Sequence, residues 1–268
     1  MFGAAMINVI VHGAAGKVGR EVLRALCSDA ELKAAGAVDL KADSDRLPLP
    51  DGSGQIPFSA DLETIIPQTN PDVMVDFTIR EAAMPAIRTA ARYGVNLVIG
   101  TTGLSSEDID EIDELSRQSD IGAVVAPNFS LGAVLMIHIA KLAASYFDYA
   151  EVIEKHQEAK ADAPSGTALA TAQAMVAARG RPFGYPILKK ESLAGTRGGQ
   201  VEGISVHSVR LPGFLAHQEV ILGAPGQTLT IKHDSISRES FMPGVVMAVK
   251  YVVKNRGLIY GLEALLGL

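Results

Sequence analysis

The feature that most constrains the fold of this chain is an alternation of short apolar runs with helical patterns over residues 1–130. The apolar runs lie at 7–11, in a stretch ending at 37–39, and at 73–77, 95–99 and 121–125. Helical patterns lie between them, at Val18, Val22, Leu23 and Leu26 and again near 80–93 and 105–118. Strands separated by helices predict a parallel sheet with right-handed crossovers. We therefore predict an α/β domain with a doubly wound parallel sheet.

The remainder of the chain shows a different pattern. Its expected elements are helices at 130–146 and 166–179 and strands at 204–210, 218–222 and 228–233. The turn sequence at 224–227 predicts that the last two strands form an antiparallel hairpin. A helix over 238–254 follows, with Gly257 as its terminator, and the polar stretch 189–203 is expected to be mobile. We expect a second, α+β domain whose mixed or antiparallel sheet keeps one face for another protomer.

Composition and charge exclude several functional classes. The formal net charge of −6 argues against a general nucleic-acid or anionic-membrane binder. One cysteine, Cys27, excludes an internal disulfide framework and argues against a metal site built from cysteines. Residues 1–6 lack the basic region of a secretory leader, and no apolar run reaches the roughly 18 residues of a membrane span. We expect a cytoplasmic protein that binds neither nucleic acid nor membrane.

A glycine-rich segment, Gly13-Ala14-Ala15-Gly16-Lys17-Val18-Gly19, follows the first expected strand and opens the first helix. Its spacing is a variant of the dinucleotide-binding turn, in which glycines let the backbone approach a pyrophosphate that faces the helix N–H groups. The alternative is a plain glycine turn without a ligand. Asp39 ends the second strand, where an acid can bind a ribose 2′-hydroxyl and so favours NAD. Because Lys17 and Lys41 can instead pair with a 2′-phosphate, the choice between NAD and NADP stays open.

Two further loops follow strands at the same expected edge of the sheet. They are Gly100-Thr101-Thr102-Gly103 and Ala126-Pro127-Asn128-Phe129-Ser130. Ligands of open α/β sheets bind outside the carboxyl ends of the strands, and both loops offer hydroxyl, amide and backbone donors there. Either loop can also be a simple helix-capping turn. We expect both to contact a ligand.

The most informative segment of the chain is 154–167. His156 and Lys160 are four residues apart, so a strand or a helix would place both on one side. A histidine can act as a general acid near neutral pH, and a lysine beside it can hold an anion or deliver a proton. The remaining histidines show no metal-ligand spacing and are expected to be structural, although the first of them adjoins the glycine loop: His12, His138, His207, His217 and His233.

The same segment ends in a helix start. Pro164 fixes the backbone, and Ser165 or Thr167 can cap the helix that follows. Gly166 would leave backbone N–H groups free to bind a carboxylate or phosphate. The alternative is that Asp162 or Ser165 merely caps the helix, while the histidine and the lysine are solvated.

Taken together, these segments resemble the 4-hydroxy-tetrahydrodipicolinate reductase (dihydrodipicolinate reductase) family over essentially the whole chain. The resemblance rests on 11–20, 75–78, 100–103, 126–132 and, most specifically, the Asp-Ala-Pro-Ser-Gly-Thr run at 162–167. It implies NAD(P)H-dependent reduction of a cyclic dicarboxylate, 4-hydroxy-tetrahydrodipicolinate, to tetrahydrodipicolinate in diaminopimelate and lysine biosynthesis. The implied fold is a Rossmann-type domain followed by an α+β domain.

The resemblance also implies roles for individual residues. His156 corresponds to the catalytic acid/base and Lys160 to the proton donor, which also contacts substrate. Gly166 and Thr167 correspond to the carboxylate-binding pair at the helix start. The implied cofactor contacts are Gly13, Ala14, Ala15, Gly16, Lys17, Val18, Asp39, Gly100, Thr101, Thr102, Ala126, Pro127, Asn128 and Phe129. The implied domains are 1–130 with 240–268 for the dinucleotide and 131–239 for substrate and for assembly into a homotetramer, and no metal is implied.

Two positions depart from the family pattern. Family members usually carry a second histidine where this chain has Gln157, which can hydrogen-bond a carboxylate but cannot become a cation. Leu40 replaces an arginine that holds the NADP phosphate in some members, and Lys41 lies one residue late, so we expect NADH with tolerance for NADPH. Because of Gln157, a second interpretation stays open, in which the chain is a related reductase of another cyclic imine or keto acid. A nucleotide-sensing protein without chemistry is a third interpretation, against which His156 and Lys160 count.

Overall fold

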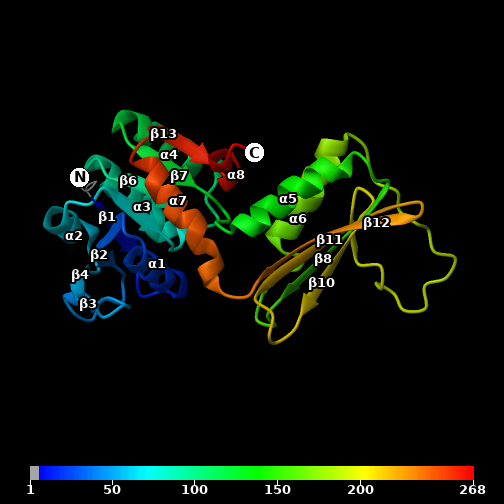
Figure 1. The fold of residues 1–268 in the computed structure, drawn as a ribbon, viewed down its shortest axis with the longest axis horizontal. Coiled ribbons are helices and arrows are strands. Elements are labelled where there is room, and N and C mark those ends of the chain that lie inside the picture. Colours follow the sequence, from blue (N-terminus) through cyan, green and yellow to red (C-terminus); the bar gives the residue numbers. More distant parts are fainter. Residues whose placement is uncertain (1–5) are drawn as a thin grey trace. The chain divides into compact units, whose positions relative to one another are not determined.

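The structure is a computed structural model that describes residues 6–268, so most of the segment considered for a secretory leader lies outside it. The chain forms two compact units (Figure 1). The first consists of Met1–Leu131 and Arg238–Leu268, and the second of Gly132–Ser237. The chain therefore leaves the first unit, builds the second, and returns to complete the first. Among the residues that the structure describes, no helix has the length and apolar character needed to cross a membrane.

The first unit is built on a sheet with the strand order β13-β7-β6-β5-β1-β2-β4-β3. Its strands are β1 (Ile7–His12), β2 (Leu32–Val38), β3 (Arg46–Pro48), β4 (Gln55–Ser59), β5 (Val73–Asp76), β6 (Asn96–Ile99), β7 (Gly122–Val125) and β13 (Gly257–Tyr260). Its helices are α1 (Lys17–Ser28), α2 (Leu62–Thr69), α3 (Arg80–Arg92), α4 (Ser106–Gln118), α7 (Met242–Val252) and α8 (Leu262–Leu266). Neighbouring strands are parallel except for β3 and β4. The predicted doubly wound sheet is confirmed.

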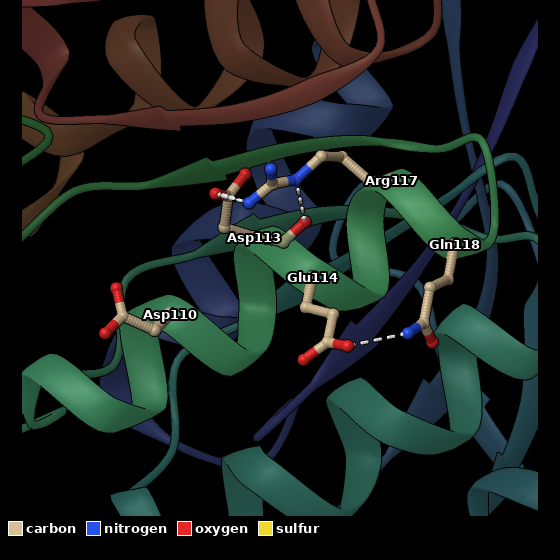
Figure 2. Close-up of a pocket in the computed structure, with 5 residues that line it drawn as sticks. All are labelled: Asp110, Asp113, Glu114, Arg117 and Gln118. Atoms are coloured by element: carbon tan, nitrogen blue, oxygen red, sulfur yellow. Dashed lines mark hydrogen bonds and ion pairs between the residues drawn. The ribbon is translucent and has the colours of Figure 1, made fainter.

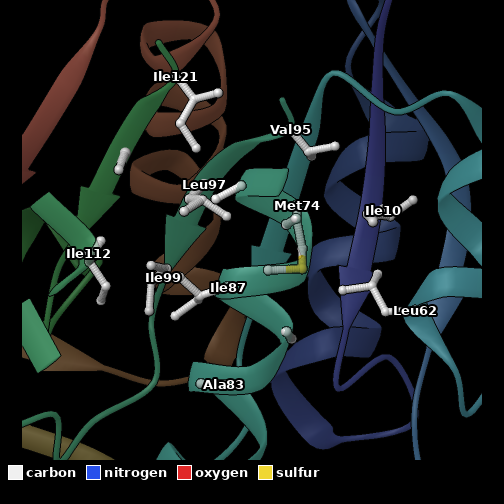
Figure 3. Packing of buried hydrophobic residues seen from close by; sticks show 14 of the residues in the cluster. Ile10, Leu62, Met74, Ala83, Ile87, Val95, Leu97, Ile99, Ile112 and Ile121 are labelled. Atoms are coloured by element: carbon white, nitrogen blue, oxygen red, sulfur yellow. The ribbon is translucent and has the colours of Figure 1, made fainter. Parts of the chain in front are cut away.

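Burial on both faces explains why the strands of this sheet are continuously apolar. Successive side chains of a strand point to opposite faces. One alternate set packs under α2, α3 and α4, where Met74 and Leu97 belong to the same buried cluster as Ile87 and Ile112 (Figure 3). Helices α1 and α7 contact each other and the strands. The sheet is thus a rigid platform that fixes the loops at its carboxyl edge.

The return of the chain to this sheet differs from the prediction of one helix over 238–254. Residues Arg238–Phe241 form a 3₁₀ turn, and α7 starts at Met242 because Pro243 fits the first turn of an α-helix. The prediction that Gly257 ends this helix is wrong. The helix ends at Val252, and Gly257, with φ of 84°, begins β13, which pairs in parallel with β7.

The second unit contains a mixed sheet with the order β12-β11-β8-β10-β9 and the helices α5 and α6. Its elements are α5 (Leu131–Ala144), β8 (Tyr149–His156), α6 (Gly166–Arg179), β9 (Gly199–Val201), β10 (Ile204–Arg210), β11 (Ala216–Ala224) and β12 (Gln227–Ser235). Strands β8 and β10 are parallel, and the predicted hairpin of β11 and β12 is confirmed. Side chains of α5 and α6, including Met136 and Met175, pack with Val152 and Val220 on one face of the sheet. Part of the stretch expected to be mobile, 199–201, is instead strand β9, paired with β10.

An ion pair at the start of α4 is expected to make the stability of the first unit depend on pH in the acid range. Hydrogen bonds from Arg80 and from the Ser105 backbone lower the pKa of Asp108 to about 2, from an ordinary value of 3.8. A carboxyl whose folded-state pKa is lowered adds stability above its unfolded pKa and loses it as the pH falls through the folded value. We expect Asp108→Asn to flatten the fall in Tm between about pH 4 and pH 2. Asp110→Asn, on the exposed side of the same helix, is the control, and equal profiles for the two variants would contradict the expectation.

Candidate active site

The glycine loop between β1 and α1 is held so tightly that side chains do not fit. Gly13 has φ of 83°, a conformation that side chains rarely adopt, and a Cβ there would lie 2.7 Å from the carbonyl oxygen of Phe77. A Cβ at Gly19 would lie 2.2 Å from the carbonyl oxygen of Gly13. The glycines therefore let the turn fold onto the start of its own helix, as a dinucleotide-binding turn requires.

The first turn of α1 has the character of an anion site. Gly16 precedes the helix without a side-chain cap, and the first turn carries no acidic residue. Among the described residues, no backbone acceptor satisfies the N–H groups of Lys17 and Val18. The start of α4 contrasts with it, because a capping box of Ser105 and Asp108 satisfies that terminus. The start of α1 thus fits a pyrophosphate group.

Asp39 lies just beyond the end of β2, beside the glycine loop. Its Oδ2 accepts the N–H of Ala15 at 2.9 Å, and its Oδ1 accepts the N–H of Lys41 at 3.0 Å. Each carboxylate oxygen can accept a further hydrogen bond. The structure thus brings the acid predicted to bind a ribose next to the loop predicted to bind the pyrophosphate.

A cavity of about 440 Å³ opens at this place. It is lined by Ala14, Ala15, Arg20, Leu23, Arg24, Lys41, Asp43, Leu47, Pro48, Pro50 and Phe58. Arg24 is paired with Glu21, whereas Arg20 and Lys41 are exposed cations at its rim. Apart from these cations and Asp43, the lining residues are apolar. A cavity of this kind fits the adenosine part of a dinucleotide.

A buried polar network lies under the neighbouring loops. The Asp76 carboxylate, which is fully buried, is 2.5 Å from Nδ1 of His12 and also accepts the hydroxyls of Thr78 and Thr101. Thr101 Oγ1 accepts the N–H of Thr78 at 2.9 Å. The network connects the carboxyl ends of β1, β5 and β6. The side chain of Thr101 is thus engaged in positioning its loop, whereas Thr102 is exposed.

In the loop after β7, fewer side chains are accessible to a ligand than the sequence predicts. The Phe129 side chain is buried and packs edge-on against Phe77, with ring centroids 5.6 Å apart. Asn128 Oδ1 accepts the N–H of Ser130, which turns the chain into α5. Exposed Pro127 and half-buried Asn128 therefore remain as the accessible side chains of this loop.

A second cavity in the first unit, of about 510 Å³, offers no comparable chemistry. It is lined by Asp110, Asp113, Glu114, Arg117 and Gln118, all of which project from α4 (Figure 2). Arg117 pairs with Asp113, and Gln118 bonds Glu114, so the polar groups satisfy one another within the helix. We assign no function to this surface.

The segment predicted to be catalytic lies in the second unit, where β8 ends. His156 is the last residue of β8, and Lys160 lies in the loop that follows, where its N–H bonds the Gln157 carbonyl oxygen. The premise that one regular element carries both residues is therefore wrong. The His156 side chain is mostly buried and its Nδ1 lies 2.5 Å from Oε2 of Glu154. Lys160 Nζ is 2.6 Å from Oδ1 of Asp162, and Gln157 is exposed.

Strand β8 positions the histidine through a carboxylate that the sequence analysis missed. Glu154 is fully buried and receives both terminal nitrogens of Arg210, each at 2.8 Å. Burial by itself raises the pKa of Glu154, but hydrogen bonds from Arg210, Ser208 and His156 together hold it below its ordinary value. A Glu-x-His spacing on a strand, which puts both side chains on one face, is the signal that could have identified it. Arg210 lies 56 residues from Glu154 in the sequence and therefore gave no local signal.

The start of α6 provides backbone donors. Ser165 caps the helix by accepting the N–H of Ala168, and its own N–H donates to Glu154. Within the described part of the chain, no backbone acceptor satisfies the N–H groups of Gly166 and Thr167. Gly166 is exposed, and a Cβ there would meet nothing within 4 Å. This terminus can therefore hold a carboxylate.

Comparison with known proteins identifies the family. The family model "Dihydrodipicolinate reductase, N-terminus" matches residues 7–129, and "Dihydrodipicolinate reductase, C-terminus" matches residues 132–266. The chain belongs to the dihydrodipicolinate reductase family. It is 59% identical over 262 residues to a 4-hydroxy-tetrahydrodipicolinate reductase of Dehalococcoides mccartyi, covering 98% of this chain and 99% of the relative.

Two further dihydrodipicolinate reductases agree with this assignment. A 4-hydroxy-tetrahydrodipicolinate reductase of Moorella thermoacetica is 50% identical over 265 residues, covering 98% of each chain. A dipicolinate-bound dihydrodipicolinate reductase from Paenisporosarcina sp. TG-14 has a similar structure, with a TM-score of 0.85, 39% identity, and coverage of 97% of this chain and 99% of that one. The chain is thus an NAD(P)H-dependent oxidoreductase that reduces 4-hydroxy-tetrahydrodipicolinate in lysine biosynthesis.

Proposed function

We propose that His156 is the acid/base of this reductase and that Lys160 and the start of α6 bind its dicarboxylate substrate. When bound, NAD(P)H supplies the hydride. The observation that carries the proposal is that His156 ends β8 with one ring nitrogen held by Glu154, which leaves the other nitrogen to exchange a proton with substrate. A histidine held in this way suits general acid catalysis near neutral pH.

Positive potential supports substrate binding in this acidic protein. Lys160 carries a cation, and the free N–H groups of Gly166 and Thr167 lie at the positive end of the α6 dipole. The Asp162 carboxylate now paired with Lys160 is exposed, so a substrate carboxylate can replace it. Exposed Gln157 can donate a hydrogen bond to the same substrate but adds no charge.

For the cofactor, we propose that the first unit binds it along the glycine loop and prefers NADH while accepting NADPH. Asp39 supports NADH, because its carboxylate can accept the 2′-hydroxyl of a ribose and repels a phosphate there. Arg20 and Lys41, both exposed at the rim of the adjacent cavity, support tolerance of NADPH. The backbone of the Thr102 and Asn128 loops would complete the contacts.

For assembly, we propose a homotetramer formed through the sheet of the second unit. The face of this sheet opposite α5 and α6 carries half-buried apolar side chains, including Ile153, Val209 and Ile221. Apolar surface that one chain leaves half-covered is typical of a protein interface. We also propose that the enzyme works in the cytoplasm, as its biosynthetic role suggests. Light scattering of the purified protein tests the tetramer.

The activity assay uses substrate made in situ from pyruvate and aspartate semialdehyde by the preceding condensing enzyme. Absorbance at 340 nm is followed with NADH and with NADPH in separate reactions. Consumption that requires every component, and that is faster with NADH, is the expected result. Intact NADH binding without consumption would contradict the proposed roles and favour a nucleotide sensor.

Lys160→Ala is expected to raise KM and to lower kcat together. The value of one hydrogen bond to a charged group, about 1.5–3 kcal/mol, corresponds to a fall in kcat/KM of about 10- to 100-fold. Lys141→Ala, an exposed lysine of α5 in the same unit, is the matched control. Steady-state kinetics of both variants measure the effect, and wild-type constants for Lys160→Ala would remove this residue from substrate binding.

A further inference from the structure

A single buried carboxylate connects the two parts of the proposed substrate site. Glu154 Oε2 lies 2.5 Å from Nδ1 of His156, and its Oε1 accepts the N–H of Ser165 at 3.2 Å. Ser165 is the N-cap of α6, whose next two N–H groups are the proposed carboxylate donors. The same side chain thus contacts the residue proposed to transfer a proton and the helix proposed to bind the substrate.

Arg210 compensates the charge that this arrangement buries. Its two terminal nitrogens donate to the two oxygens of Glu154, and one of them also donates to the carbonyl oxygen of Asp162 at 2.6 Å. A buried carboxylate without such a partner would be strongly disfavoured. Arg210 therefore keeps Glu154 ionised and ties the loop that contains Lys160 to the same carboxylate.

An ionised carboxylate determines which nitrogen of the histidine carries the proton. It can only accept hydrogen bonds, so Nδ1 of His156 must be the donor in this contact. In the neutral ring Nε2 is then the unprotonated nitrogen, and in the charged ring it is the nitrogen that can release a proton. The geometry thus selects Nε2 as the atom that exchanges a proton with the substrate.

We propose that Glu154, held by Arg210, is a positioning residue that fixes His156 in the Nδ1–H form and aligns it with the start of α6. This inference rests on the proposed role of His156. It deepens that role by assigning the acid/base chemistry to one ring nitrogen, and it explains why a charged pair occupies the core beside a substrate site.

The other charged and titratable groups near His156 define the environment in which this carboxylate acts. Strand β8 adds Lys155, which pairs with Glu219, and the following loop adds Lys160 and Asp162. Strand β10 places Arg210 directly opposite His156, whereas β11 places uncharged Ala216 there. Glu154 is therefore the anion in hydrogen-bond contact with the imidazole.

The first test measures the wild-type protein and uses a variant only to assign its signals. Nitrogen NMR of protein labelled with ¹⁵N-histidine distinguishes a protonated from an unprotonated ring nitrogen, and the His156 signals are assigned by their loss in His156→Gln. Above the pH at which the ring becomes neutral, we expect Nδ1 of His156 to be protonated and Nε2 to be unprotonated. The reverse pattern would overturn the proposal, whatever the activity of the enzyme.

The second test compares two carboxylates of the same strand. Glu151, like Glu154, contacts a histidine and an arginine, His207 at 3.0 Å and Arg197 at 2.7 Å, but it does not touch His156. We expect Glu154→Gln to lower kcat by about 10- to 100-fold, the range known for carboxylates that hold the second ring nitrogen of metal-bound histidines. Glu151→Gln is expected to keep wild-type kinetics, provided that light scattering gives both variants the wild-type mass.

The pH profile separates positioning from a general loss of structure. Glu154→Gln removes the anion that contacts the imidazole, so the dependence of kcat on pH is expected to differ from that of the wild type. Glu154→Asp keeps the charge and is expected to restore part of kcat. Equal losses of kcat in the Glu151 and Glu154 variants, or an unmoved profile, would overturn the proposal. If Glu154→Gln does not fold, the wild-type NMR measurement still decides.

The proposed reaction at His156 and the proposed positioning role of Glu154 can be disproved separately. If wild-type protein does not oxidise NADH with the substrate made in situ, the assignment of the reaction to this site fails, while the NMR result still reports on Glu154. If the reductase is active but the ring carries its proton on Nε2, only the positioning role fails.

Discussion

His156→Ala is expected to lower kcat by about 10²–10⁴-fold, the usual contribution of a general acid or base. The alanine removes the side chain that ends β8 but leaves Glu154 paired with Arg210 and with the N–H of Ser165. The buried charge therefore stays compensated, so the free energy of unfolding should change far less than the rate.

Three measurements test this expectation. Steady-state kinetics give kcat, thermal unfolding gives Tm, and fluorescence titration gives the Kd for NADH, which should match that of the wild type because the glycine loop belongs to the other unit. His138→Ala, at an α5 histidine outside the proposed site, serves as the control. A wild-type kcat for His156→Ala would remove His156 from the mechanism.

Gly19→Ala is expected to have the second large effect, on cofactor binding. The added Cβ would lie 2.2 Å from the carbonyl oxygen of Gly13 and 2.8 Å from Cα of Ala14. Both neighbours are backbone atoms, so no side chain can rotate away and the turn itself must move. Overpacking of this kind costs about 1–3 kcal/mol of stability. We expect the Kd for NADH to rise at least about tenfold, a loss of about 1.4 kcal/mol in binding free energy.

The control for this variant is Gly199→Ala, because a Cβ there would have no neighbour closer than 4.0 Å. NADH titration and thermal unfolding of both variants separate the two effects of the added methyl group. A wild-type Kd in Gly19→Ala would show that the turn does not form the cofactor cradle.

The parts of the fold that the sequence predicted are those in which one physical pattern dominates. Strands of the parallel sheet are apolar on both faces, and the helices 80–93 and 105–118 begin and end close to the observed α3 and α4. Strand β8 was not predicted because charged residues such as Glu154 and Lys155 interrupt its alternation. These charges satisfy tertiary partners rather than solvent, and a single sequence does not reveal such partners.

The candidate site was predictable to a similar degree. The glycine loop, Asp39 and the start of α6 depend on local backbone chemistry, and each lies where the sequence pattern indicated. The places of Glu154 and Arg210 in the site were not predicted, because their pairing depends on the parallel contact of β8 with β10. Helix α2 and strands β3 and β4 were not predicted because they are short. Each also contains a proline (Pro67, Pro48 and Pro57, respectively), which weakens any periodic signal.

The pairing of β13 with β7 has a consequence for synthesis on the ribosome. Between Val125, which ends β7, and Tyr260, which ends β13, the ribosome must add the whole second unit, and this takes about 7 to 27 s at about 5–20 residues per second. During that time the outer edge of β7 has no neighbouring strand, and bare strand edges promote aggregation. A chain that ended between residues 237 and 257 would therefore have a complete second unit but a sheet whose β7 edge lacks its partner strand.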